Sequence, residues 1–214
     1  MSPKKKSPKN PFPGNPIRSV CVYCGSGPGS DPAFVAGAEQ FGRILAENGV
    51  RLVYGGGSIG LMGAIASAVT TAGGQVTGII PDFLTGRERP AADVQELIVT
   101  RDMHERKRLM FERADAFVAL PGGIGTLEEL IEQLTWAQLG QHKKPILIAN
   151  ISGFWDPLRV LLDHMTTLRF IRPNLPVDLL VADRVTDILP MLEKAARAVS
   201  VTDALMDSNA AAKM

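Results

Sequence analysis

The sequence predicts an α/β protein, a single domain built on a doubly wound parallel sheet with helices on both faces. Short apolar runs alternate with amphipathic segments of helical period, which is the pattern of repeated β-α-β units. Three glycine-rich turns each follow an apolar run and precede a helical segment. With 214 residues, 45% of them hydrophobic, the chain is long enough to bury one substantial core.

The elements follow from the two hydrophobic periods. Strands are predicted where short apolar runs lie between turn residues, and helices where apolar residues recur every three or four positions. The predicted strands cover residues 18–24, 51–54, 75–80, 96–99, 115–120, 145–149 and 179–181. The predicted helices cover residues 31–48, 61–71, 103–113, 127–139, 155–168 and 185–199. Glycines follow the first two helices as stop signals, and a polar, irregular segment spans 82–93.

The two ends of the chain differ from the middle. Residues 1–16 contain four lysines and five prolines and lack the apolar segment of a secretory signal. We expect a disordered basic tail there, with a basic targeting arm as the alternative. Residues 17–200 are expected to form the folded domain, and residues 201–214 a C-terminal tail.

Composition excludes several classes of protein. A formal net charge of +1 indicates no general nucleic-acid or membrane partner, and no apolar run is long enough to span a bilayer. Cys21 and Cys24 have the C-x-x-C spacing of redox and zinc sites. They lie in and just after a predicted strand, whereas a redox pair normally opens a helix. We therefore expect core cysteines, a reducing cytoplasmic location, and neither metal nor cofactor.

The glycine-rich turns, at 24–29, 55–60 and 121–125, are the first functional signal. Parallel strands end at the same edge of a sheet, so the three turns should meet where α/β folds bind phosphate. None has the Gly-Lys-Ser/Thr ending of a P-loop, and the first departs from G-x-G-x-x-G, which favours a mononucleotide over a dinucleotide. The predicted substrate contacts in these turns are Gly25, Ser26, Gly56, Gly57, Gly122, Gly123, Gly125 and Thr126.

Two charged runs accompany the turns. In the run 101–108, Asp102 is a helix cap that places Arg106 and Lys107 in the next turn, near the ligand edge. These cations form either a solvated helix face or an anion contact. Glu128 and Glu129 lie in the first turns of the helix after Pro121. They either complement the helix dipole or reach the sugar of a nucleotide.

Together these motifs resemble the Lonely Guy (LOG) family, the cytokinin riboside 5′-monophosphate phosphoribohydrolases, once labelled lysine decarboxylases. The resemblance covers about residues 19–198. It is carried by the segments 22–26, 53–63, 102–107, 121–129 and 135–140. No lysine has a convincing pyridoxal-phosphate setting, so the older label has no support in the residues.

The resemblance implies a Rossmann-like enzyme that hydrolyses the N-glycosidic bond of an adenine-type nucleoside 5′-monophosphate, AMP included. By the same resemblance, Arg106 and Glu129 are the catalytic pair. Further substrate contacts are implied at Glu88, Met103, Lys107, Thr135 and residues 122–126. Ile124 departs from the tyrosine frequent in the family. A homodimer is also implied, and the helix 127–139 is apolar enough to be shared between subunits.

The chemistry agrees with this assignment. Glycosidic cleavage builds positive charge on the sugar. The Glu129 carboxylate can stabilise that charge, bind ribose hydroxyls or orient the attacking water. Arg106 can offset negative charge on the departing base. Two rival functions stay open: a general nucleotide 5′-monophosphate nucleosidase, and a non-catalytic binder similar to molybdenum-cofactor carriers.

Overall fold

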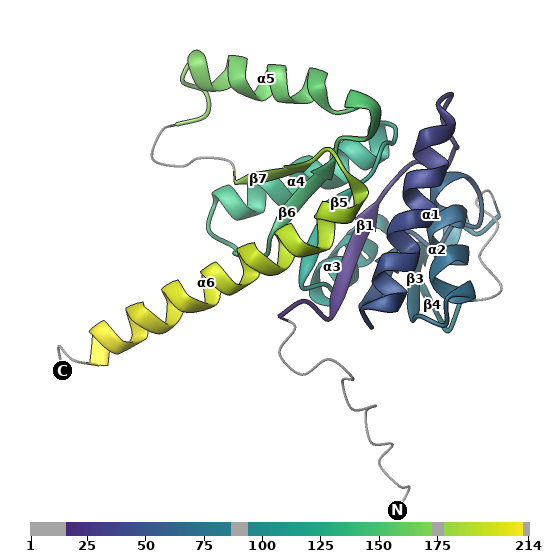
Figure 1. Cartoon of the computed structure of the whole chain (residues 1–214), viewed down its shortest axis with the longest axis horizontal. Helices are drawn as coiled ribbons and strands as arrows, with labels where there is room; N and C mark the ends of the chain where they lie inside the picture. The colour runs from purple at the N-terminus through teal and green to yellow at the C-terminus, as the bar shows by residue number, and fades with distance from the viewer. Residues whose placement is uncertain (1–15, 87–93, 173–177, 212–214) are drawn as a thin grey trace, which may run out of the picture.

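The computed structural model describes residues 16–86, 94–172 and 178–211. In that part of the chain seven strands, all parallel, form one sheet in the order β4-β3-β2-β1-β5-β6-β7 (Figure 1). The strands are β1 Ser19–Tyr23, β2 Arg51–Tyr54, β3 Val76–Pro81, β4 Glu96–Thr100, β5 Ala116–Ala119, β6 Ile146–Ala149 and β7 Leu179–Ala182. The predicted doubly wound parallel sheet is confirmed.

The helices connect the strands as the periodicity predicts. They are α1 Pro32–Glu47, α2 Gly60–Thr71, α3 Met103–Glu112, α4 Ile124–Gln138, α5 Asp156–Thr167 and α6 Ile188–Ala211, with short 3₁₀ turns η1 Asp82–Leu84, η2 Ile151–Gly153 and η3 Val185–Asp187. The predicted cap Asp102 accepts a hydrogen bond of 2.8 Å from the backbone N–H of Glu105. Asp31 caps α1 in the same way, through the N–H of Ala33 at 2.8 Å.

The sheet separates two cores. Val20 and Val22 of β1 face the layer of α1, α2 and α6, and Cys21 and Tyr23 face the layer of α3 and α4. This alternation is the two-residue period of a strand buried on both faces. In Figure 1, α1 and α2 lie side by side against one face. None of the residues of α5 is buried.

The three glycine turns meet as predicted. They follow β1, β2 and β5, and β1 lies between the other two strands. The N–H of Gly25 donates to the carbonyl of Pro121 at 3.1 Å, and the N–H of Leu61 donates to the carbonyl of Gly25 at 3.1 Å. The strand order reverses at β1, because β2, β3 and β4 lie on one side of it and β5, β6 and β7 on the other. In open parallel sheets the ligand crevice lies at the carboxyl ends of the two strands at such a reversal, here β1 and β5.

The ends of two helices differ from the prediction. α4 begins at Ile124 rather than Leu127, because Gly125 and Thr126 adopt helical conformation directly after the extended Gly123. α6 continues to Ala211, so the predicted C-terminal tail is helical up to that residue. Its last part is rich in alanine and other helix-favouring residues. The predicted basic tail lies outside the described residues except for Pro16. Of the described helices, none combines the length and apolarity that crossing a bilayer requires.

Candidate active site

A pocket of about 240 Å³ lies at the carboxyl edge of the sheet. It is formed by the ends of β1 and β2, the first turns of α4, and one side chain from α3. Five of the predicted substrate contacts line it, namely Gly25, Ser26, Gly123, Gly125 and Thr126. Both members of the predicted catalytic pair line it too. The structure therefore brings together residues from four separate segments of the sequence.

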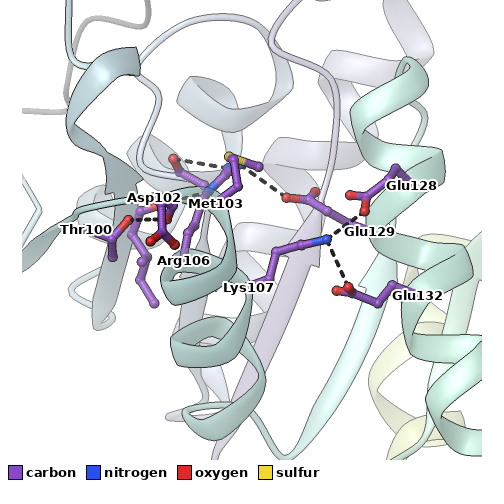
Figure 2. Close-up of polar contacts among 10 residues, drawn as sticks. Thr100, Asp102, Met103, Arg106, Lys107, Glu128, Glu129 and Glu132 are labelled. Atoms are coloured by element: carbon purple, nitrogen blue, oxygen red, sulfur yellow. Dashed lines mark hydrogen bonds and ion pairs between the residues drawn. The ribbon is translucent and has the colours of Figure 1, made fainter.

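Arg106 is held on three sides at the floor of this pocket (Figure 2). Its Nε donates to the carbonyl of Ile79 at 3.1 Å, and its Nη2 donates to the carbonyl of Gly55 at 3.5 Å. Its Nη1 lies 3.4 Å from Oε1 of Glu129 and 3.8 Å from Sδ of Met103. The side chains of Arg106 and Glu129 are 9% and 10% exposed. A pair this deeply buried needs such partners, because desolvation of an unpaired charge is costly.

Gly55 permits this placement of the guanidinium. A Cβ at Gly55 would collide with Nη2 of Arg106. The sequence prediction chose the next two glycines, Gly56 and Gly57, which are buried and do not line the pocket. Gly56 instead has a φ of +82° and packs beneath Ile80. Gly55 and Met62, which both line the pocket, are residues that the prediction missed.

The turn before α4 provides an anion site. Gly123 precedes the helix in extended conformation, and it has no side chain with which to cap the first N–H groups. At a helix N-terminus, such N–H groups can donate hydrogen bonds to the oxygens of a phosphate. Gly122 lines the neighbouring, mainly apolar pocket. It must be glycine, because a Cβ there would collide with Thr126 Oγ1 and lie 2.9 Å from the N atom of Gly25.

Among the other predicted contacts, Met103, Lys107 and Thr135 do not line the pocket. Lys107 does not line the pocket, because its Nζ donates to Glu128 at 2.7 Å and to Glu132 at 2.9 Å (Figure 2). Burial lowers the pKa of Lys107, but the two carboxylates outweigh it and the net pKa is raised. Thr135 is exposed and donates to the carbonyl of Ile131 at 2.8 Å. Glu88 lies outside the described residues.

The end of β1 adds three side chains behind the carboxylate. Tyr23 and Cys24 line the pocket, and Cys21 is fully buried beneath it. Burial, and then the nearby Glu129 carboxylate, raise the pKa of the Cys21 thiol. Burial, Cys21 and Glu129 in turn raise the pKa of Tyr23. Cys21 and Tyr23 are therefore neutral beside the pair. Cys21 and Cys24 are both buried and form no disulfide, as the core interpretation predicts.

The described residues offer no group of three or more His, Cys, Asp or Glu side chains arranged to hold a metal ion. The pocket is lined by the start of α4, which has no side-chain cap, and, one turn further along that helix, by a carboxylate paired with a guanidinium. Such a site can bind a phosphate ester and stabilise charges of both signs in the group attached to it.

Comparison with known protein sequences finds matches that cover most of the chain. The family model described as "Possible lysine decarboxylase" matches residues 62–192. The rice protein cytokinin riboside 5′-monophosphate phosphoribohydrolase LOG (Oryza sativa subsp. japonica) is 45% identical over 178 residues, which are 83% of this chain and 74% of that protein. The Arabidopsis thaliana protein of the same name, LOG7, is 42% identical over 83% of this chain and 82% of its own.

Solved structures show the same fold at lower identity. The structural-genomics target TM1055 is 24% identical, with a TM-score of 0.66 over 83% of this chain and 99% of its own. The Moco carrier protein from Chlamydomonas reinhardtii is 20% identical, with a TM-score of 0.62 over 84% of this chain and 98% of its own. At these identities the likeness concerns the fold alone. On the strength of the family model and the curated relatives, the chain belongs to the LOG family.

Proposed function

We propose that this chain is a phosphoribohydrolase that converts cytokinin riboside 5′-monophosphates into the free base and ribose 5-phosphate. The observation that carries the proposal is the buried Arg106–Glu129 pair, which lies in the pocket one helical turn from the anion site of α4. The relatives that share 42–45% of their residues with this chain carry the corresponding name.

The phosphate binds at the first turn of α4, where backbone N–H groups and the helix dipole favour an anion. Gly123, Gly125 and Thr126 supply this surface. Because the phosphate is remote from the bond that breaks, its binding energy serves to fix the sugar relative to Glu129. This arrangement predicts that nucleosides without the phosphate are poor substrates.

The reaction breaks the bond between C1′ of the ribose and the base nitrogen, and the bonding electrons leave with the base. The oxygen of a water molecule then bonds to C1′, and a proton from that water ends on the base. Positive charge builds on the sugar, where the Glu129 carboxylate stabilises it, binds ribose hydroxyls or orients the water. Arg106 stabilises the negative charge of the departing base by a charge-assisted hydrogen bond. An arginine guanidinium is too weak an acid to act as the proton donor.

The test is to incubate the purified protein with isopentenyladenosine 5′-monophosphate and to follow free base and ribose 5-phosphate by chromatography. The proposal expects both products in equal amounts. Stoichiometric binding without release of base would contradict it and favour the carrier function.

AMP in a parallel incubation addresses the base specificity. We propose that AMP is also cleaved, since it has the same phosphate, ribose and glycosidic bond, on which the anion site and the Arg106–Glu129 pair are proposed to act. Faster release from AMP than from the isopentenyl substrate would instead favour a general nucleotide nucleosidase.

We also propose that the chain forms a homodimer in the cytoplasm. α5 and the segment after it expose large apolar side chains, namely Val160, Leu161, Met165, Leu168 and Phe170. An exposed apolar stripe of this kind supports a self-complementary contact about a two-fold axis. The buried free thiols support a reducing compartment. Light scattering after size exclusion should give twice the chain mass, and Val160→Glu should give the monomer. A monomeric wild type would contradict the proposal.

A further inference from the structure

Two adjacent residues of α3 reach two different parts of α4. Arg106 turns into the pocket toward Glu129, and Lys107 turns toward Glu128 and Glu132 (Figure 2). The two lysine-bound carboxylates flank Glu129 on α4, one position before it and three positions after it. Lys107 therefore offsets part of the negative charge on Glu128 and Glu132, the acidic neighbours of Glu129.

The lysine contacts are shielded from solvent. The side chains of Lys107 and Glu132 are 14% and 21% exposed, and Nζ of Lys107 lies 2.9 Å from Oε1 of Glu132. Oε2 of Glu132 is buried and has no hydrogen-bond partner within the part of the chain that the structure describes. A carboxylate in that position depends strongly on its cation, because desolvation opposes the charged form. Glu128 is half exposed, so its charge is better solvated.

We propose that Lys107 is a positioning residue and not a phosphate ligand: by offsetting part of the negative charge of Glu128 and Glu132, it keeps Glu129 ionised and directed toward Arg106. The inference rests on the proposed function, because it concerns the carboxylate that stabilises the sugar. Its geometric basis is the pair of short Lys107 contacts outside the pocket. The resemblance to the family had implied a substrate contact for this lysine.

Groups from two other elements lie close to Glu129. Nη1 of Arg106 on α3 is 3.4 Å from its Oε1, and from β1 the neutral Cys21 and Tyr23 are near enough to feel its charge. On its own helix the charged neighbours are Glu128 and Glu132. If Lys107 loses its charge, two negative groups lie within one turn of Glu129. Like charges favour the protonated form of a carboxyl group, so Glu129 would hold its proton up to a higher pH.

The experiment measures kcat and KM against pH for the wild type, Lys107→Met and Lys107→Arg, with isopentenyladenosine 5′-monophosphate as substrate. Lys107→Met should move the acid limb of the kcat profile to higher pH by about one unit, with KM at the alkaline plateau changed less than about threefold. Lys107→Arg retains the charge and should keep the limb within about 0.3 unit of the wild type.

Substitution of Glu132, a partner of Lys107, tests whether the effect of Lys107→Met is one of charge. In the double variant Lys107→Met, Glu132→Gln, one unneutralised carboxylate is gone, so the acid limb should return toward the wild-type position. Glu132→Gln alone leaves Lys107 with Glu128 as its one partner of the two, so one negative charge near Glu129 is gone and the limb should move to lower pH. This result does not depend on whether Lys107→Met folds. The restoration separates an electrostatic role from a purely structural one, because a packing defect is not repaired by a second uncharged substitution.

Three results would overturn the inference. A large rise in KM with an unmoved acid limb would make Lys107 a phosphate ligand. An equal loss at every pH, not restored by Glu132→Gln, would make its role one of packing only. An upward shift of the limb in Glu132→Gln alone would reverse the predicted sign. Absence of base release by the wild type is a different result, because it contradicts the proposed function itself.

Discussion

The helices on the two faces of the sheet bury different kinds of residues. On one face, the buried residues of α1 and α2 are all apolar or glycine, and the two helices approach closely at Gly42. On the face of α3 and α4, the buried residues include Arg106, Thr126, Glu129 and Gln133. The first face stabilises the fold by dispersion and apolar burial. The second buries charges that add little to stability unless they are well paired, which is typical of a functional site.

This difference predicts that the two faces respond differently to substitution. Changes in the α3–α4 layer at the pocket should reduce turnover by more than any loss of folding free energy explains, even where they leave a buried charge unpaired. Changes in the α1–α2 layer should reduce the folding free energy and leave turnover near the wild-type value. Substitutions that affected both properties equally on both faces would remove the distinction.

Arg106→Met should give the largest loss on the charged face. Methionine keeps most of the length of the side chain but removes the groups that bind Glu129 and the departing base, so kcat should fall by about 10²–10³-fold. Arg108→Met is the matched control, because Arg108 lies on the same helix in an exposed pair with Glu112. That control should change the free energy of unfolding by less than about 0.5 kcal/mol and leave kcat unaltered. Equal losses in the two variants would contradict a specific role for Arg106.

Gly42→Leu should give the largest loss on the apolar face. Even a Cβ at Gly42 would lie 2.7 Å from the carbonyl oxygen of Ile65 and 2.8 Å from Cβ of Ala68, so α1 and α2 must move apart. Overpacking of this kind costs about 1–3 kcal/mol, or roughly 2–12 °C in Tm for a chain of this size. Thermal unfolding followed by circular dichroism measures the change, and kcat at low temperature should stay close to wild type. Gly86→Ala is the control, since nothing lies within 4 Å of a Cβ there.

Ile124→Tyr should have the smallest effect. Ile124 lines the pocket with a side chain that is 82% exposed, and the anion site beside it is made of backbone N–H groups. Restoring the tyrosine that the family resemblance leads one to expect should therefore change kcat and KM by less than about threefold. A change of KM beyond tenfold would show that this side chain contacts the substrate directly.

Much of this architecture is predictable from the sequence. The meeting of the three glycine turns follows from parallel strands alone, and Asp102 caps the helix that its position predicts. The sequence does not predict which of Gly55, Gly56 and Gly57 lines the pocket, because a run of glycines does not indicate which one faces Arg106. Nor does the sequence reveal that Lys107 binds Glu128 and Glu132, since that depends on the rotation of α3 against α4. The amphipathic pattern of α5 likewise resembles that of a buried helix, although no residue of α5 is buried.

The most direct test of the central claim, that the Arg106–Glu129 pair carries out glycosidic hydrolysis, is the single-turnover rate of base release by Glu129→Gln. Glutamine preserves the shape of the side chain but removes its charge, while the anion site of α4 is untouched. The account predicts a rate at least about 10²-fold lower than wild type, with the Kd for isopentenyladenosine 5′-monophosphate changed by less than about fivefold. A rate near that of the wild type would contradict it.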